Sequence, residues 1–194
     1  MSDAILSSQV EAAPPIDLRN LLWVAMALAV MLAAIASGQP WFLNFVHVMA
    51  GALWTGIDLF MGFVLGPILR KASFEARRAI TIRLLPKTIF LMPTLAVVTG
   101  TSGYFHARQL GFMDVPAPQF YWVAAALAVI TILTVQGLGI LLPTNFLVYF
   151  EMRKEQADRE RIRRLMERYI YAVSFQGVMQ VTILVLMAKF ATGL

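Results

Sequence analysis

Residues 41–69 read WFLNFVHVMAGALWTGIDLFMGFVLGPIL, and this stretch decides the fold. Only Asn44, His47 and Asp58 interrupt its apolar character. About 20 mostly apolar residues are enough for a helix to cross a bilayer. Within hydrocarbon, every backbone N–H and C=O must find its partner inside the same segment. The stretch is therefore predicted to be a transmembrane helix.

Four more segments have the same character, and they are 21–37, 84–105, 120–150 and 169–192. We therefore expect an all-α integral membrane bundle of five transmembrane helices, forming a single domain over 1–194 behind a polar tail, 1–19. The chain of 194 residues is 59% hydrophobic and 14% charged. Soluble domains are roughly 45–50% apolar and about 25% charged, so the composition excludes a soluble enzyme and a nucleic-acid binder. The absence of cysteine excludes disulfides and thiolate metal sites.

The first segment has an alternative interpretation as a cleaved signal peptide, because Ala34-Ile35-Ala36 resembles a signal-peptidase site. A signal peptide begins with a basic region, whereas this tail holds three acidic residues, Asp3, Glu11 and Asp17, against Arg19. A retained first helix is the favoured prediction.

The distribution of Lys and Arg predicts the orientation of the bundle. Thirteen of the 16 basic residues lie in the tail, in the connection after the second span and in the connection after the fourth span. The opposite side has only Arg108 and Lys189, while Lys87 lies inside the third span. Basic loops stay in the cytoplasm, so we expect a cytoplasmic N-terminus and an outer C-terminus in a bacterial plasma membrane.

The segment 151–168 contains neither Pro nor Gly, and we expect it to continue the fourth span as a charged cytoplasmic helix. Opposite charges at i,i+4 support a helix, and they occur at Lys154–Asp158, Glu155–Arg159, Glu160–Arg164 and Arg163–Glu167. The favoured interpretation is a linking helix whose apolar stripe packs on its own bundle. The alternatives are a docking helix for a partner subunit and attachment to anionic lipid headgroups.

Polar residues inside the spans are the candidate functional residues, because they are costly in lipid. In the second span they form one helical stripe with small residues, which consists of His47, Gly51, Trp54, Asp58 and Gly62. In the third span the corresponding stripe is Thr99, Ser102, Gly103 and His106. His47 and His106 are the only histidines, and the topology places both in the outer leaflet. Two imidazoles on neighbouring helices could ligate haem b or, as an alternative, copper.

Asp58 and Lys87 both belong to the cytoplasmic half of the bundle, where they could form a buried charge pair or a proton relay. Alternatively, Lys87 reaches toward the inner headgroups, and Asp58 then needs a glutamine partner. The available glutamines are Gln136, Gln176 and Gln180. They are interpreted first as interhelical hydrogen-bonding groups and second as the lining of a quinone or proton path.

The run from His47 through Gly51, Trp54 and Gly56 to Gly66-Pro67 resembles a known helix. It is similar to the H-x3-G-x2-W-x-G helix of small bacterial membrane proteins of the copper-resistance CopD type, of the N-terminal domain of membrane-bound urate hydroxylase and of the haem-dependent membrane protoporphyrinogen oxidase. The resemblance covers residues 41–108. It implies a four- or five-helix bundle in which His47 ligates haem b or interacts with copper, with Gly51 and Trp54 as neighbours.

The chain is therefore predicted to be a small inner-membrane protein that holds haem b near its outer face, with copper as the less favoured hypothesis. It would serve electron transfer or a membrane redox reaction, with a quinone or a cytochrome as partner. The alternative is a cofactor-free scaffold or assembly subunit of a larger membrane complex, or a homo-oligomer. A transporter is a third hypothesis, disfavoured because paired broken helices are not evident. No set of residues assembles into a catalytic mechanism, so a catalytic role would depend on the resemblance.

Overall fold

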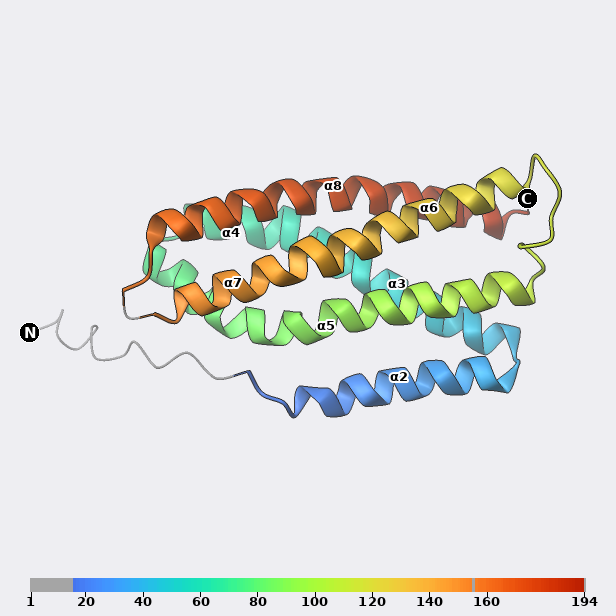
Figure 1. The fold of residues 1–194 in the computed structure, drawn as a ribbon, viewed down its shortest axis with the longest axis horizontal. Helices are drawn as coiled ribbons and strands as arrows, with labels where there is room; N and C mark the ends of the chain where they lie inside the picture. The colour runs from blue at the N-terminus through green and yellow to red at the C-terminus, as the bar shows by residue number, and fades with distance from the viewer. Residues whose placement is uncertain (1–15, 155, 194) are drawn as a thin grey trace, which may run out of the picture.

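The structure is a computed structural model that describes residues 16–154 and 156–193, and its regular structure in those ranges is entirely helical. Five helices or helical stacks are long and apolar enough to cross a membrane. They are α2 (Asn20–Ser37), α3 (Pro40–Leu59) continued by η1 (Phe60–Leu65) and α4 (Gly66–Lys71), α5 (Phe74–Gln109), α6 (Phe120–Gln136) continued by η2 (Gly137–Leu141) and α7 (Leu142–Met152), and α8 (Arg159–Ala191). The segments η1 and η2 are π-helical. The five spans run side by side in an elongated bundle (Figure 1). The prediction of an all-α bundle of five membrane-length helices is confirmed.

The first two spans form a hairpin. Gly38 ends α2 in the left-handed conformation, with a φ of 64°, which glycine adopts without steric cost. Pro40 occupies the first turn of α3, where its missing N–H has no helical partner to lose. The chain therefore reverses within two residues, and α2 is continuous through the predicted cleavage site at Ala34-Ile35-Ala36. In the predicted tail, Asp3 and Glu11 lie outside the described residues.

The third span begins ten residues before the predicted boundary at 84. Ser73 caps α5 by accepting a hydrogen bond from the backbone N–H of Ala76. The basic residues that follow this cap belong to the helix itself. They form a charged extension of α5 beyond its apolar part.

The charged segment 151–168 differs from the prediction, because the fourth span does not continue through it. Helix α7 ends at Met152, the described residues 153, 154 and 156–158 are not helical, and Asp158 caps the start of α8. The predicted pair Lys154–Asp158 does not form; Lys154 Nζ instead lies 2.8 Å from Glu151 Oε2. Glu155 lies outside the described residues. The pairs Glu160–Arg164 at 3.5 Å and Arg163–Glu167 at 2.5 Å form within α8.

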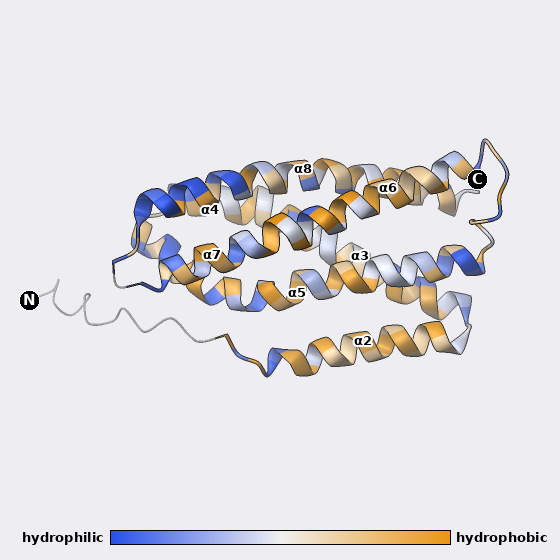
Figure 2. Ribbon diagram, in the orientation of Figure 1, coloured by the Kyte–Doolittle hydropathy of each residue, from blue (hydrophilic) through white to orange (hydrophobic). Residues whose placement is uncertain are grey.

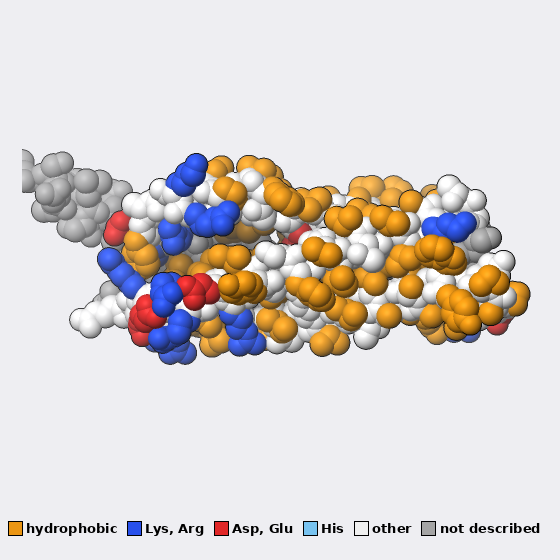
Figure 3. All heavy atoms as spheres, turned by 90° about the horizontal axis from the view of Figure 1, so that it is seen from above, with side chains coloured by type: hydrophobic (Ala, Val, Ile, Leu, Met, Phe, Trp, Pro, Cys, Tyr) orange, Lys and Arg blue, Asp and Glu red, His pale blue; other side chains and the backbone are white. Residues whose placement is uncertain are grey.

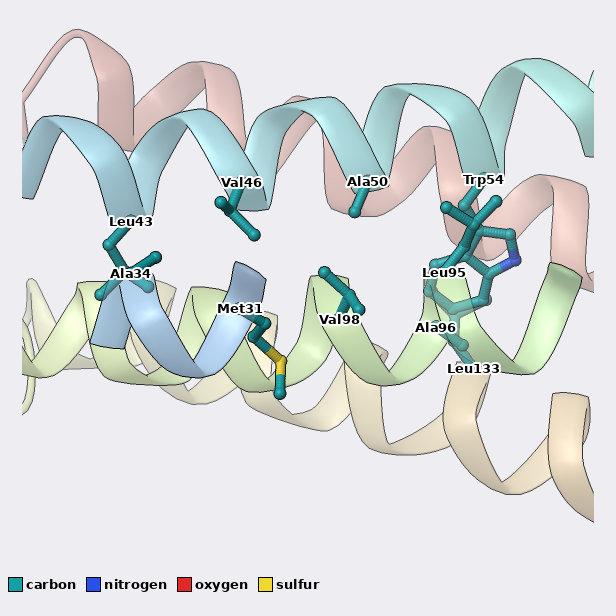
Figure 4. Close-up of a cluster of buried hydrophobic side chains, with 10 residues drawn as sticks. All are labelled: Met31, Ala34, Leu43, Val46, Ala50, Trp54, Leu95, Ala96, Val98 and Leu133. Atoms are coloured by element: carbon teal, nitrogen blue, oxygen red, sulfur yellow. The ribbon is translucent and has the colours of Figure 1, made fainter. Parts of the chain in front are cut away.

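The main apolar core lies where α2, α3, α5 and α6 meet (Figure 4). Leu43, Val46, Ala50 and Trp54 of α3 face α2 and α5 there, and Leu133 joins them from α6. On the outside of the bundle large apolar side chains are exposed, such as Leu22, Phe63 and Tyr171, each at least 75%. Exposed apolar side chains are what the lipid around a bundle requires, and Figure 2 shows that hydrophobic residues occur along the helices.

The two basic connections meet at one end of the bundle, where charged side chains of both signs gather (Figure 3). Arg78 joins them: its Nε donates to the Met152 carbonyl at 2.8 Å, and its Nη2 donates to the Lys154 carbonyl at 2.9 Å. Helix α2 begins at this end and α8 ends at the opposite one (Figure 1). This agrees with the charge asymmetry, while the side of the membrane that each end faces stays a prediction.

Candidate functional site

His47 is held by the helix that it faces. Its Nδ1 lies 2.9 Å from the Thr99 carbonyl oxygen of α5. This distance assigns the ring proton to Nδ1, because the carbonyl can only accept. No described residue hydrogen-bonds to Nε2, so the lone pair on that nitrogen is available.

Gly103 provides the space in which the His47 ring lies. A Cβ atom on this residue would lie 2.6 Å from His47 Cε1 and 2.7 Å from Nδ1, closer than such atoms approach. Gly51 lies on α3, one turn after His47. A Cβ atom on Gly51 would lie 3.3 Å from Thr99 Cγ2 of α5. The two small-residue stripes predicted from the sequence therefore face each other, and α3 packs closely on α5.

His106 follows Gly103 by three residues, so it lies on the same face of α5, one turn nearer the helix end. Its side chain is half-buried, and its Nδ1 is buried without a hydrogen-bond partner among the described residues. Buried ring nitrogens normally have a hydrogen-bond partner, so the hydrogen-bonding capacity of His106 Nδ1 is unsatisfied. The topology thus brings the two histidines to neighbouring positions on facing helices.

Asp58, the second polar centre, lies on α3 deeper in the bundle. Its Oδ2 accepts hydrogen bonds from Gln176 Nε2 at 2.5 Å and from Gln180 Nε2 at 2.7 Å, both on α8. Trp54, one turn earlier on α3, lines the same cavity as Asp58. Within the described chain no ion pair joins Asp58 to Lys87, and the Lys87 side chain is exposed. Glutamines therefore take the place that the charge-pair hypothesis gave to a lysine.

A cavity of about 40 Å³ adjoins Asp58 between α3, α5, α6–α7 and α8. Several of its walls carry oxygen-bearing side chains, which are those of Asp58, Thr88, Thr134, Asn145, Tyr169 and Gln176. The π-helical segment η2 contributes Gly137, Leu138 and Leu141 to the wall, and η1 begins two residues after Asp58 on the neighbouring span. Such segments are common at functional sites.

Gln136 lies apart from this cavity. Its Nε2 donates to the Ala172 carbonyl of α8, which makes it an interhelical hydrogen-bonding group. It also lines an open groove between α6–η2 and α8, together with Phe175, Tyr171 and Arg168. The three glutamines are therefore divided between the Asp58 cluster and this groove.

Among the described residues, no three His, Cys, Asp or Glu side chains gather in a way that could hold a metal ion. Comparisons with family models, curated proteins and solved structures find no match for this chain. The resemblance of the His47 helix to the known membrane-protein helix therefore stays a prediction.

Sequence reasoning missed several members of both centres. The Thr99 carbonyl is a backbone atom, so its bond to His47 has no signature in the sequence. Thr88 follows Lys87 and Asn145 follows Thr144, and neither pair belongs to a periodic polar stripe in the sequence. Tyr169 precedes Gln176 and Gln180 by seven and eleven residues on α8, and this helical spacing could have placed it on their face.

Proposed function

We propose that this chain is a small multi-pass membrane protein that holds haem b at His47 and serves electron transfer or a redox reaction in the membrane. The observation that supports the proposal is the hydrogen bond between His47 Nδ1 and the Thr99 carbonyl. Histidines that ligate metals usually donate their other ring N–H to a carbonyl or a carboxylate. This second bond fixes the tautomer and aims Nε2.

The residues fit one axial haem ligand and offer a second. His47 would bind through Nε2, because its Nδ1 edge is occupied by Thr99 and Gly103. His106 carries a buried nitrogen without a partner on the facing helix, which suits a second ligand. Bound haem would supply reversible one-electron chemistry at its iron.

Haem is favoured over a bare copper ion by the number of ligands. The chain contains two histidines and no cysteine, so imidazole and thiolate groups give at most two bonds. A porphyrin fills four positions of its iron and needs only axial ligands from the protein. A copper ion would have to recruit methionines as well.

The chain's own residues would then have separate tasks. Thr99 would orient the imidazole, Gly103 would let it approach α5, and the surrounding apolar side chains would exclude water. Exclusion of water and the polarity around a haem are among the features with which a protein adjusts its potential.

The test is the visible absorption spectrum of the full chain, purified from cells supplied with haem precursors. Wild type is expected to show a Soret band, and His47→Ala is expected to abolish it. Asn44→Ala is the matched control, since this polar residue lies three positions earlier on α3 and is exposed. His106→Ala is expected to shift the absorption maxima. A colourless wild type, or an unchanged spectrum in His47→Ala, would contradict the proposal.

A further inference from the structure

The Asp58 cluster, which consists of Asp58, Gln176 and Gln180, is separate from His47, the proposed haem ligand, and has the features of a second binding site. Asp58 lies eleven residues from His47 on the same helix, which is about 16 Å along the axis. The carboxylate interacts with glutamines of α8, whereas the His47 ring contacts α5. The two centres can therefore be tested independently.

The Asp58 carboxyl group has no Lys or Arg partner among the described residues. Two N–H donors, from Gln176 and Gln180, are directed at the Asp58 carboxylate. N–H donors favour the ionised form of a carboxyl group, yet no Lys or Arg lines the adjoining cavity. An ionised carboxylate inside a membrane is costly unless a cation accompanies it.

The glutamines also have unused acceptors. Gln176 is 2% exposed and Gln180 is 1% exposed, and the Oε1 atom of each is buried without a partner among the described residues. Gln176 lines the cavity itself. Buried carbonyl oxygens normally accept a hydrogen bond or bind a cation. The Nε2 atoms of both amides therefore donate hydrogen bonds to Asp58, while their Oε1 atoms have no hydrogen-bond partner among the described residues.

The cavity has the size and the chemistry for a small cation. Its volume of about 40 Å³ exceeds the roughly 10–15 Å³ that one water molecule requires. The Thr88 and Thr134 hydroxyls donate to carbonyls of their own helices, so their oxygens can still accept. Hard oxygen ligands and one net negative charge favour a hard cation of low charge.

We propose that the cavity between Asp58, Thr88, Asn145 and Gln176 binds one sodium ion. Carboxylate, hydroxyl and amide oxygens would replace its hydration shell. The ion would neutralise Asp58 and satisfy the glutamine oxygen. The adjacent π-helical segments η1 and η2 would let the backbone adjust around it, as they do at many functional sites.

The test measures the thermal unfolding midpoint, Tm, of the purified full chain at constant ionic strength in sodium, potassium or choline chloride. A ligand that binds only the folded state stabilises it in proportion to the logarithm of its concentration. At a sodium concentration about a hundredfold above Kd, the Tm is expected to rise by several degrees over choline. Asp58→Asn is expected to remove this rise, and to be at least as stable as wild type in choline because no buried charge remains.

Two further variants keep the test decisive if Asp58→Asn fails to fold. Thr88→Val removes one cavity oxygen and is expected to raise the half-saturating sodium concentration several-fold. Thr182→Val on α8 is the matched control, since its hydroxyl is exposed and donates to Val178; it is expected to respond like wild type. Equal Tm values in the three salts would overturn the proposal. So would a sodium response that survives in Asp58→Asn, or a Tm that follows pH but not sodium, which would assign the site to a proton. None of these outcomes depends on haem.

Discussion

At the scale of single residues, the closest contact of the proposed haem site is a ring against a glycine. The His47 ring, which extends from α3, can pack against α5 only because Gly103 has no side chain, and the Thr99 carbonyl holds the ring there. A methyl group at Gly103 would push the ring off the Thr99 carbonyl. The position of the ligand is therefore determined by a residue that carries no functional group.

Gly103→Ala is accordingly expected to lower stability by about 1 to 3 kcal/mol, the usual cost of overpacking, and to diminish the Soret band. Gly100→Ala is the control on the same helix, because its Cβ would have only an ordinary contact, 3.8 Å from Ile130. Chemical denaturation and visible spectroscopy measure the two effects. Equal stability of the two variants would show that the contact does not constrain His47.

The sequence indicated which polar residues belong to the two centres more accurately than it indicated the residues with which their side chains pair. The stripes containing His47 and His106 do face each other, and the glutamine partners of Asp58 were one of two alternatives. Side-chain pairing within the bundle depends on how each helix is rotated about its axis. Lys87 illustrates this: it shares the expected depth with Asp58, but its side chain is exposed.

At the scale of elements, the hydropathy pattern located all five predicted spans but did not locate the residues at which the helices begin and end. The third span, α5, starts at Phe74, because the Ser73 cap and a charged first turn extend the helix beyond its apolar part. The fourth ends at Met152 although the following residues favour a helix. Tertiary contacts explain this end: the buried Glu151 accepts from Lys154 and from the backbone N–H of Asp158, and it lies 3.5 Å from Arg161.

Glu151→Ala is therefore expected to loosen the connection between α7 and α8 and to lower the Tm by a few degrees. Glu160→Ala is the matched control, because Glu160 also pairs with arginines but is exposed, and exposed pairs contribute little. Differential scanning fluorimetry compares the two variants. An equal or larger effect of Glu160→Ala would refute the anchoring role of Glu151.

At the scale of the whole molecule, the bundle is polarised by charge. Both basic connections lie at one end and are joined by Arg78. Basic connections stay in the cytoplasm, so we expect this end to be cytoplasmic and the His47 end of the bundle to face the outer side of the membrane.

Orientation can be measured directly because the chain has no cysteine. In intact cells, a membrane-impermeant maleimide is expected to label Asp114→Cys, which lies in the exposed loop before α6. It is expected to label Gln156→Cys, in the connection before α8, only after the membrane is permeabilised. The reverse pattern would invert the topology and move the proposed haem site to the cytoplasmic side.

The central claim is that His47 holds a haem, and the haem content of the purified wild-type chain tests it most directly. The pyridine haemochrome assay, combined with metal analysis of the same sample, is expected to give about one haem b per chain and no stoichiometric copper. A sample without haem, or one with copper in its place, would contradict the account.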